Sequence, residues 1–330
     1  MGKEKISMRE VSRLSGVSIA TVSRIVHQNG RFSAETERRV LEVMKNLSYS
    51  PDPIAQGMRL KHLPVIGMIV PDILDDRYGL ILRTAQKRLF ENGYSSFVFN
   101  ANEDEKQVQS FIDVMAGQRC SGLIYVPEAG ADSVDLHGIP TVFVERRPFF
   151  EVDVPHVQIV MDDKEVSFRA VEELIRAGRR KIVLLGDRMN NSFSRDRIAG
   201  AELALKEAGL DPVAVLLVNP QKSTEAISAF QEMLEKGTEA DAAFCVTVRL
   251  TIGVMSVLKE KNISRKQIVV LGIGEHRLCK YGLIEYNSIS EPLEEMACAA
   301  VDSILDMIQG GKPEQTELVF KCVSHESDAG

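Results

Sequence analysis

From Pro64 onward, apolar runs of strand length alternate with amphipathic stretches of helical length, and this alternation constrains the fold more than any other feature. A strand, a crossover helix and a second strand place the two strands side by side and parallel. Seven apolar runs fall into a first series, at 65–70, 94–99, 122–126 and 141–144, and a second series, at 181–185, 242–246 and 268–271. The pattern predicts an α/β core of two doubly wound parallel-sheet subdomains. A cleft at the strand ends is the usual place for a small ligand.

Length and charge indicate that a smaller basic module precedes this core. The chain has 330 residues, more than one ordinary compact core needs. Residues 1–62 carry 11 Lys and Arg against 6 Asp and Glu, a net charge of +5, whereas residues 63–330 carry 29 against 41, a net charge of −12. A basic module joined to an acidic one favours a nucleic-acid partner for the basic part.

Composition also excludes several classes of protein. No apolar run is long enough to span a bilayer, and the N-terminus has no signal-peptide pattern, so we expect a cytoplasmic protein without a membrane partner. The five cysteines are scattered and never spaced as CxxC, so neither a disulfide framework nor a metal site is expected. No cofactor motif is present either, because Gly272-Ile273-Gly274 lacks the third glycine of a dinucleotide loop.

The basic module has the pattern of a helix-turn-helix unit. Ser7-Met8-Arg9-Glu10 is typical of a capping box, which predicts a first helix from about Met8 to Leu14. Gly16 breaks this helix, and Ser18 is placed to cap a second helix from Ile19 to about His27. Two short helices joined by such a turn are the unit that many proteins use to bind DNA.

The apolar sides of these helices predict a shared core. On the second helix that side consists of Val22, Ile25 and Val26, which should pack against Val11 and Leu14. A third helix is expected from Ser33, with an apolar stripe formed by Val40, Leu41, Met44 and Leu47. The result would be a small all-α domain over residues 1–49. From pattern alone, it could be a DNA-binding head or a plain three-helix bundle with solvated polar faces.

The chain resembles the LacI/GalR family of transcription regulators. The most specific part of the match is Val17-Ser18-Ile19-Ala20-Thr21-Val22-Ser23-Arg24, within a resemblance over residues 6–59. The core resembles the periplasmic-binding-protein-like domain of the same family at 139–144, 197–200 and 252–254. The resemblance implies a sequence-specific DNA-binding regulator, most often a repressor, that binds a pseudo-palindromic operator as a homodimer under the control of a small-molecule effector.

The resemblance also implies a division of the chain. The helix-turn-helix head would occupy 1–49 and a hinge 50–62, followed by an effector-sensing and dimerisation core over 63–330. Within the core, an N-subdomain would comprise about 63–160 plus 290–320, and a C-subdomain about 161–289 plus 321–330. The end of the chain has no leucine heptads, so a coiled-coil tetramer is not indicated.

The exposed side of the second helix suits the major groove of DNA. An arginine can pair with guanine through two hydrogen bonds, and a small apolar group can contact a thymine methyl. The expected major-groove set is Ile19, Ala20, Thr21, Ser23, Arg24 and His27. Ser18 and Thr21, beside the helix N-terminus, are expected at phosphates. In the family asparagine is more usual at the position of His27.

The resemblance implies a hinge helix over Pro53–Arg59 that folds on the operator and enters the minor groove. The expected contacts are Ala55, Gln56, Met58 and Arg59. Met58 stands where the family usually has a leucine wedge, and Gly57 lowers the helix propensity. Read without the resemblance, 50–62 is a proline-bearing linker, and both interpretations hold if the segment becomes helical only on DNA.

Carried over position by position, the resemblance implies an effector site in the core cleft that includes Asp75, Arg77, Tyr78, Asn100, Arg197 and Glu291. We add Arg249 and Glu275, which lie near positions where the chain departs from the family. Thr247-Val248 replaces the family's usual Asn-Asp and Ile273-Gly274 its usual Phe-Asp, with Glu275 one place on, while Arg77 replaces an aromatic residue. Loss of carboxylates and gain of guanidinium groups favour an anionic effector, such as a sugar phosphate or uronate, over a neutral carbohydrate.

Two other functions stay open from the sequence. No catalytic motif such as GxSxG or HExxH occurs, which favours a protein that is not an enzyme. The chief alternative is a sugar-binding or sugar-processing α/β protein that retains the head. The other is a regulator that responds to a protein partner in place of a small molecule.

Overall fold

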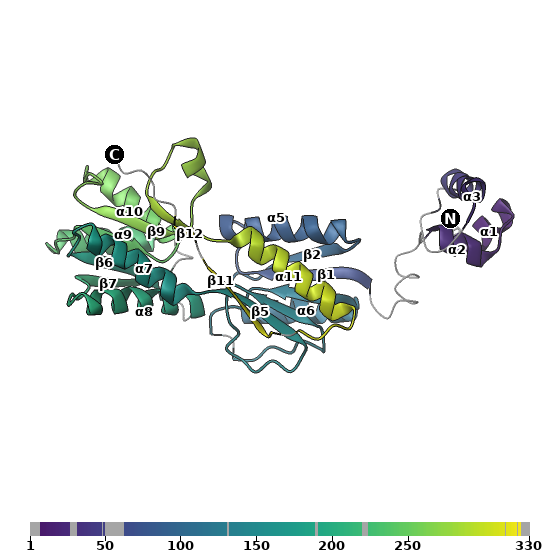
Figure 1. The fold of residues 1–330 in the computed structure, drawn as a ribbon, viewed down its shortest axis with the longest axis horizontal. Helices are drawn as coiled ribbons and strands as arrows, with labels where there is room; N and C mark the ends of the chain where they lie inside the picture. The colour runs from purple at the N-terminus through teal and green to yellow at the C-terminus, as the bar shows by residue number, and fades with distance from the viewer. Residues whose placement is uncertain are drawn as a thin grey trace. The chain divides into compact units, whose positions relative to one another are not determined.

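The computed structural model describes residues 7–26, 32–47, 49, 63–130, 132–188, 191–219, 224–313, 315–321 and 323–324. The chain divides into two compact units, residues 1–63 and residues 64–330 (Figure 1). His27 and the expected hinge contacts Ala55, Gln56, Met58 and Arg59 lie outside the described residues. No helix of the described residues is long and apolar enough to cross a membrane.

The smaller unit is a three-helix domain. Its helices are α1 (Met8–Ser15), α2 (Ile19–Val26) and α3 (Ala34–Asn46). Each helix contributes to one buried apolar cluster, which consists of Val11, Val22, Ile25 and Val40. The Ser18 hydroxyl accepts a hydrogen bond from the Thr21 amide at 3.1 Å, so the cap predicted for the second helix is confirmed.

Three details of the head differ from the predictions. Leu14 and Leu41 are each 48% exposed, because a core built by three short helices is too small to cover every apolar side chain. Ser7 precedes α1 but its hydroxyl makes no capping hydrogen bond, so the predicted capping box is wrong. The Glu10 amide donates to the Ser7 carbonyl oxygen at 2.9 Å, an ordinary first-turn bond.

The first lobe of the larger unit is built on a six-stranded sheet in the order β11-β5-β4-β3-β1-β2. The strands are β1 (Leu63–Val70), β2 (Ser95–Asn100), β3 (Cys120–Tyr125), β4 (Thr141–Val144), β5 (His156–Met161) and β11 (Glu317–Phe320). Helices α5 (Asp76–Glu91) and α11 (Leu293–Ile308) pack together on one face, and α6 (Glu105–Gly117) packs against the other (Figure 1). We call this the N-lobe.

The second lobe, the C-lobe, has a sheet in the order β12-β10-β9-β8-β6-β7. Its strands are β6 (Ile182–Asp187), β7 (Ala214–Val218), β8 (Ala242–Cys245), β9 (Val269–Ile273), β10 (Asn287–Ser290) and β12 (Val323–Ser324), and only β12 pairs antiparallel among the pairs with a defined register. Helices α7 (Asp163–Arg176) and α8 (Ser192–Glu207) pack together, as do α9 (Glu225–Glu235) and α10 (Val248–Glu260). A short 3-10 helix, η1 (Arg277–Tyr281), follows β9.

The chain passes between the lobes three times. The first crossover joins β5 to α7, the second joins β10 to α11, and the third joins β11 to β12. The two doubly wound sheets and the small helical domain confirm the predicted fold class. The first two crossovers also carry acidic side chains, Asp163 and Glu291, which place charge at the junction of the lobes.

Candidate functional site

Arg197 on α8 connects both of these crossovers. Its side chain is fully buried, and its Nε donates to Asp163 Oδ1 at 2.7 Å. Its two other nitrogens donate to the Val246 carbonyl oxygen at 2.7 Å and to Glu291 Oε1 at 2.9 Å. A planar guanidinium can hold several acceptors in fixed directions, so Arg197 ties the end of β8 to the two crossovers.

The spacing Arg197-x-x-Gly200 now has a physical reason. A Cβ atom added at Gly200 would lie 2.0 Å from the carbonyl oxygen of Lys164 on α7. Glycine is therefore needed for α8 to approach α7 closely. That close approach places Arg197 within reach of Asp163 at the beginning of α7.

Arg77 forms a second part of the network, from the N-lobe side. It follows Asp75, which caps α5 by accepting a hydrogen bond from the Arg77 amide. The Arg77 guanidinium pairs with Glu145, and its Nε lies 3.5 Å from Glu291 Oε2. Glu145 directly follows β4 with φ of 69°, a left-handed conformation that is uncommon for glutamate and often marks functional positions.

Arg146 lies next to Glu145 and forms the third part. Its Nη1 lies 2.8 Å from Glu103 Oε1 and donates to the Pro127 carbonyl oxygen at 3.0 Å. Its Nη2 donates to the Tyr78 hydroxyl at 3.1 Å. Arg146 therefore connects α5 with the loops that follow β2 and β3.

The aromatic ring of Phe193 brings the three arginines together. The guanidinium carbons of Arg197, Arg77 and Arg146 lie 4.9, 5.2 and 5.5 Å from its centroid. Three cations around one buried ring repel one another unless carboxylates compensate them, and an aromatic face adds a weaker attraction. We use the term cleft cluster for Arg77, Arg146, Arg197, Glu103, Glu145, Asp163, Glu291, Tyr78 and Phe193.

The cleft cluster perturbs the ionisation of its acids. Burial raises the pKa of Asp163 to about 6, although the Arg197 guanidinium opposes the rise. Burial also opposes ionisation of Glu145, but the neighbouring charges of Arg77, Arg146 and Arg197 outweigh it and lower the pKa. Glu128, which accepts a hydrogen bond from Tyr125 and interacts with Glu103 and Arg146, has its pKa raised by burial to about 7.

More exposed charged contacts also join the two lobes. Arg249, in the first turn of α10, pairs with Asp72, and its Nε lies 3.5 Å from Asp75 Oδ2. Asp76 lies 3.6 Å from both His276 Nε2 and Arg277 Nε on the C-lobe. These side chains are partly exposed, so salt screens them more than it screens the cleft cluster.

The structure brings together six of the eight predicted effector residues. Arg77, Tyr78, Arg197 and Glu291 belong to the cleft cluster, and Asp75 and Arg249 form one ion pair between the lobes. Asn100 accepts a hydrogen bond from the Ile73 amide at 2.8 Å and so supports the loop after β1. Glu275 is exposed at the end of β9 and makes none of the contacts of the cleft cluster.

Gly274 explains one departure from the family pattern. Its φ of 89° suits glycine, and an added Cβ would lie 2.8 Å from Glu291 Oε2 and 2.7 Å from Val248 Cγ2. An aspartate at this position would therefore displace the Glu291 carboxylate. The negative charge that the family usually has after β9 is supplied in this chain from the second crossover.

Sequence reasoning missed five members of the cleft cluster: Glu103, Glu145, Arg146, Asp163 and Phe193. Three of them follow strands closely, since Glu145 and Arg146 come after β4 and Asp163 after β5. Polar residues at the carboxyl ends of parallel strands are a signal that would find them. Glu103 and Phe193 carry no such signal, because their roles depend on how loops and α8 pack.

In the head, α2 presents a mixed surface. Ile19, Ala20 and Arg24 are exposed, and Thr21 and Ser23 are half-buried. The Ser18 and Thr21 hydroxyls lie 2.9 Å apart beside the helix N-terminus. The buried side of the same helix holds Val22 and Ile25, so the described members of the predicted major-groove set lie on the part of the helix that does not pack on the domain core.

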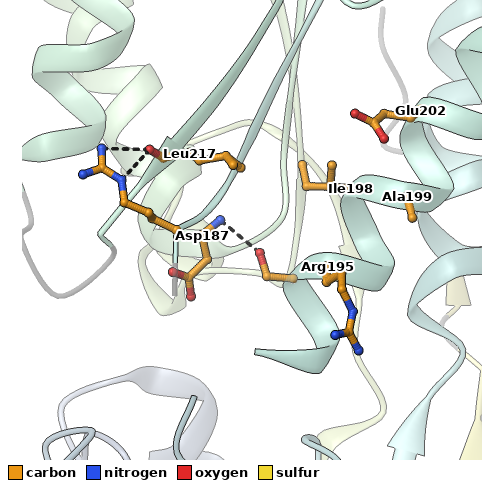
Figure 2. A pocket seen from close by; sticks show the side chains of 8 residues that line it. Asp187, Arg195, Ile198, Ala199, Glu202 and Leu217 are labelled. Carbon is orange, nitrogen blue, oxygen red and sulfur yellow. Dashed lines mark hydrogen bonds between the residues drawn. The ribbon is translucent and has the colours of Figure 1, made fainter. Parts of the chain in front are cut away.

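A separate surface pocket lies on the C-lobe between α8 and the edge strand β7 (Figure 2). It has a volume of about 310 Å³ and is lined by Asp187, Arg188, Ser194, Arg195, Ile198, Ala199, Glu202 and Leu217. The Asp187 amide donates to the Ser194 hydroxyl at 3.0 Å, and Arg188 donates to the Leu217 carbonyl oxygen (Figure 2). None of the predicted effector residues lines it.

Comparisons with known proteins cover most of the chain. Residues 63–304 match a family described as periplasmic binding proteins and sugar binding domain of LacI family, and residues 7–52 match bacterial regulatory proteins, lacI family. The HTH-type transcriptional regulator AscG of Escherichia coli (strain K12) is 27% identical over 317 residues, 92% of this chain and 93% of AscG. The HTH-type transcriptional repressor PurR of Haemophilus influenzae (strain PittEE) is 26% identical over 314 residues, 92% and 91% of the two chains.

Solved structures share the fold. The Lac repressor dimer bound to operator and the anti-inducer ONPF gives a TM-score of 0.83 at 21% identity, covering 97% of each chain. The complex of the transcriptional regulator CelR with cellobiose gives a TM-score of 0.71 at 19% identity, covering 98% of this chain and 100% of the other. The arrangement of the core as two parallel-sheet lobes is therefore one that these structures have in common with this chain.

Proposed function

The chain belongs to the LacI family of bacterial regulatory proteins and is a DNA-binding transcription regulator, and we propose that it represses by binding an inverted-repeat operator as a homodimer under the control of a cleft-bound effector. The observation that carries the proposal is the pairing, on one chain, of a helix-turn-helix head with a two-lobed core whose charged residues meet at the crossovers. Relatives that match over most of the chain are named as transcriptional regulators and repressors. These names do not favour the alternative of a sugar-processing α/β protein that retains the head.

We assign operator reading to the exposed face of α2. Ile19, Ala20 and Arg24 would enter the major groove with Thr21 and Ser23, while Ser18 and Thr21 would lie near phosphates. The hinge contacts Ala55, Gln56, Met58 and Arg59, and His27, belong to the same proposal through the family resemblance. Because the operator would be chromosomal DNA of a bacterium, we place the protein in the cytoplasm.

The proposed dimer forms through the core. β2 is an edge strand, and its Phe97 and Val98 are exposed, as is Phe90 near the end of α5. Edge strands with exposed apolar side chains are normally covered in the functional assembly. The Lac repressor neighbour is itself a dimer on its operator, which supports the same assembly, with head in 1–49, hinge in 50–62 and core in 63–330.

The effector would bind in the cleft between the lobes. CelR was solved with cellobiose, which supports a small molecule of carbohydrate type or a derivative. The anionic effector remains a prediction, and the pairing of Arg77, Arg197 and Arg249 with carboxylates removes the argument that unpaired guanidinium groups favour it. A ligand that binds one arrangement of the lobes more tightly would change operator affinity, and DNA would change ligand affinity by the same factor.

The proposal is tested by operator binding. Fluorescence anisotropy with an inverted repeat selected from random DNA should show a strong preference for that repeat over a scrambled duplex. Arg24→Ala should cost about 1–3 kcal/mol and relax the preference at one base position in each half-site. Arg176→Ala, which removes an exposed arginine on α7 in the core, is the matched control and should leave binding unchanged. Weak binding indifferent to sequence would point to a sugar-binding protein that has kept its head.

A further inference from the structure

The cleft cluster, taken together with Glu128, is short of positive charge. Five carboxyl side chains and three guanidinium groups there are each 9% exposed or less. The acids are Glu103, Glu128, Glu145, Asp163 and Glu291, and the bases are Arg77, Arg146 and Arg197. Fully ionised, the group would have two negative charges in excess, and buried charge without compensation is costly. Burial is the main cause of the raised pKa values of Asp163 and Glu128, and neighbouring carboxylates add to the rise in both.

Hydrogen bonding shows the same imbalance. Among the described residues, Glu145 Oε2 and Glu128 Oε1 are buried and accept no hydrogen bond, while Arg146 Nε donates none. Buried polar atoms without partners are rare in proteins, and each is unfavourable. Glu145 Oε2 is therefore a buried acceptor that a hydrogen-bond donor of a ligand can fill.

The Arg77 guanidinium lies where carboxylates and an aromatic ring from both lobes surround one cation. The guanidinium lies between Glu145, on the N-lobe, and Glu291, on the second crossover. The ring of Phe193, on the C-lobe, completes the surroundings at 5.2 Å. Carboxylates combined with an aromatic face are the groups with which proteins recognise ligand ammonium and guanidinium groups.

Arg77 is also held differently from its two neighbours. Arg197 and Arg146 each donate to a backbone carbonyl oxygen, of Val246 and Pro127, which fixes them to the framework. The side-chain hydrogen bonds and ion pairs that the structure records for Arg77 in the described part of the chain go to Glu145 and Glu291. A long side chain held by two carboxylates can be exchanged for another cation without loss of a backbone contact.

We propose that this point, formed by Glu145, Glu291 and Phe193, recognises a positively charged nitrogen group of the effector, an ammonium or amidinium, and that the Arg77 guanidinium occupies the same point in this structure. The inference rests on the proposed function, in which the cleft holds the effector, and it names the effector's chemical class. An incoming cation would contact both lobes and the second crossover at once. An anion would face Glu145 and Glu291 and would increase the excess of negative charge.

The test removes the built-in cation and supplies one from solution. In the full chain, Arg77→Ala should create a site that binds methylguanidinium, and methylurea and acetate serve as neutral and anionic probes of similar size. We expect methylguanidinium at millimolar concentration to raise the unfolding midpoint and to bind at least about tenfold more tightly than methylurea, since a charge-assisted hydrogen bond is stronger than a neutral one. Glu145→Gln or Glu291→Gln in the same background should abolish the difference.

Arg83→Ala is the matched control. Arg83 lies on the same helix as Arg77, but it is mostly exposed and pairs with Glu294 on the surface, so its removal should create no preference among the probes. If Arg77→Ala does not fold, Arg77→Leu takes its place, because leucine keeps the packing of the aliphatic stem and leaves the space of the guanidinium group open. Equal or tighter binding of methylurea or acetate, or no binding of methylguanidinium to a folded variant, would overturn the proposal.

Operator binding separates this inference from the proposed function. If the wild-type chain fails to select an inverted repeat while the variant still prefers methylguanidinium, the regulatory proposal fails and the charge preference of the cleft stands. If operator binding is specific and the probe preference is absent, the regulatory proposal stands and the inferred effector class is wrong.

Discussion

Replacing Arg197 by leucine removes the side chain that joins both crossovers, and the structure allows the effect to be estimated. The change eliminates hydrogen bonds to Asp163, Val246 and Glu291, and it leaves two buried carboxylates without that partner. Breaking a buried ion pair by removing one member typically costs about 3–5 kcal/mol. For a core of this size, such a loss lowers the unfolding midpoint by about 5–15 °C.

The same substitution should depend on pH in a defined direction. In the folded wild type, burial raises the pKa of Asp163 to about 6, and loss of the Arg197 charge raises it further. Below pH 6 the acid is largely protonated in both proteins, so the difference between them is smaller. Above pH 6 the wild type holds a paired carboxylate that the variant cannot stabilise. The difference in stability between the two proteins should therefore grow from about pH 6 to pH 8.

Urea unfolding of the full chain, followed by circular dichroism at pH 5.5 and pH 8, measures both effects. Arg176→Leu is the control, because Arg176 is mostly exposed and pairs with Glu172 one helical turn away on α7. It should change stability by no more than about 0.5 kcal/mol at either pH. If Arg197→Leu lowers the free energy of unfolding by less than about 1 kcal/mol, or if the loss does not grow with pH, Arg197 does not stabilise the core in the way inferred from its contacts.

Three further predictions concern other parts of the chain. Burial raises the pKa of Glu128 to about 7, so the folded state holds this proton more tightly than the unfolded state, and stability should fall as the pH rises from about 4 to 7. Glu128→Gln should reduce that fall, whereas Glu202→Gln, on an exposed side chain, should not. Urea unfolding midpoints measured across this pH range check the prediction. Ser18→Ala should destabilise the head by about 1 kcal/mol, because the α2 cap at 3.1 Å is lost, and amide exchange on α2 reports it. Arg249→Gln should reduce the sensitivity of the core's thermal midpoint to salt, since it removes partly exposed ion pairs between the lobes, whereas Arg265→Gln, which removes an exposed pair away from the cleft, should not.

The seven apolar runs of the sequence all become strands, with ends that differ from the predicted ones by at most two residues. Five strands were not predicted: β5, β7, β10, β11 and β12. β7, β11 and β12 lie at sheet edges, and β12 is only two residues long. β7 is an apolar run, Ala214–Val218, that the prediction missed, and two of its apolar side chains, Val215 and Leu217, are exposed. β10 reads Asn287-Ser288-Ile289-Ser290 and has a single apolar residue. Its strand conformation comes from pairing with β9 and not from its own composition.

The site was predictable in part. Arg197, Glu291 and Arg77 follow from the family resemblance at their positions, and the structure places them in one network. The partners of these arginines could not be inferred, because Glu145 and Asp163 follow different strands and the sequence does not show which carboxylate contacts which guanidinium. For the same reason a count of gained arginines suggested an anionic effector, whereas the cleft holds more carboxyl groups than guanidinium groups.

The position of Asp163 and Glu291 on two of the crossovers connects stability with regulation. A movement of one lobe relative to the other requires a change in the three segments that join them. Arg197 bonds to acids on two of these segments. Arg77 bonds to the same Glu291 from the N-lobe. A ligand cation that replaces Arg77 would therefore change the ion pairing of Glu291. Because Arg197 also bonds to Glu291, its hydrogen bond to Asp163 on the first crossover would be affected in turn. In the proposed function this coupling would run through one shared carboxylate, so Glu291→Gln should weaken both the stability of the core and the response of operator affinity to the effector, whereas Glu294→Gln, on the exposed face of α11, should change neither.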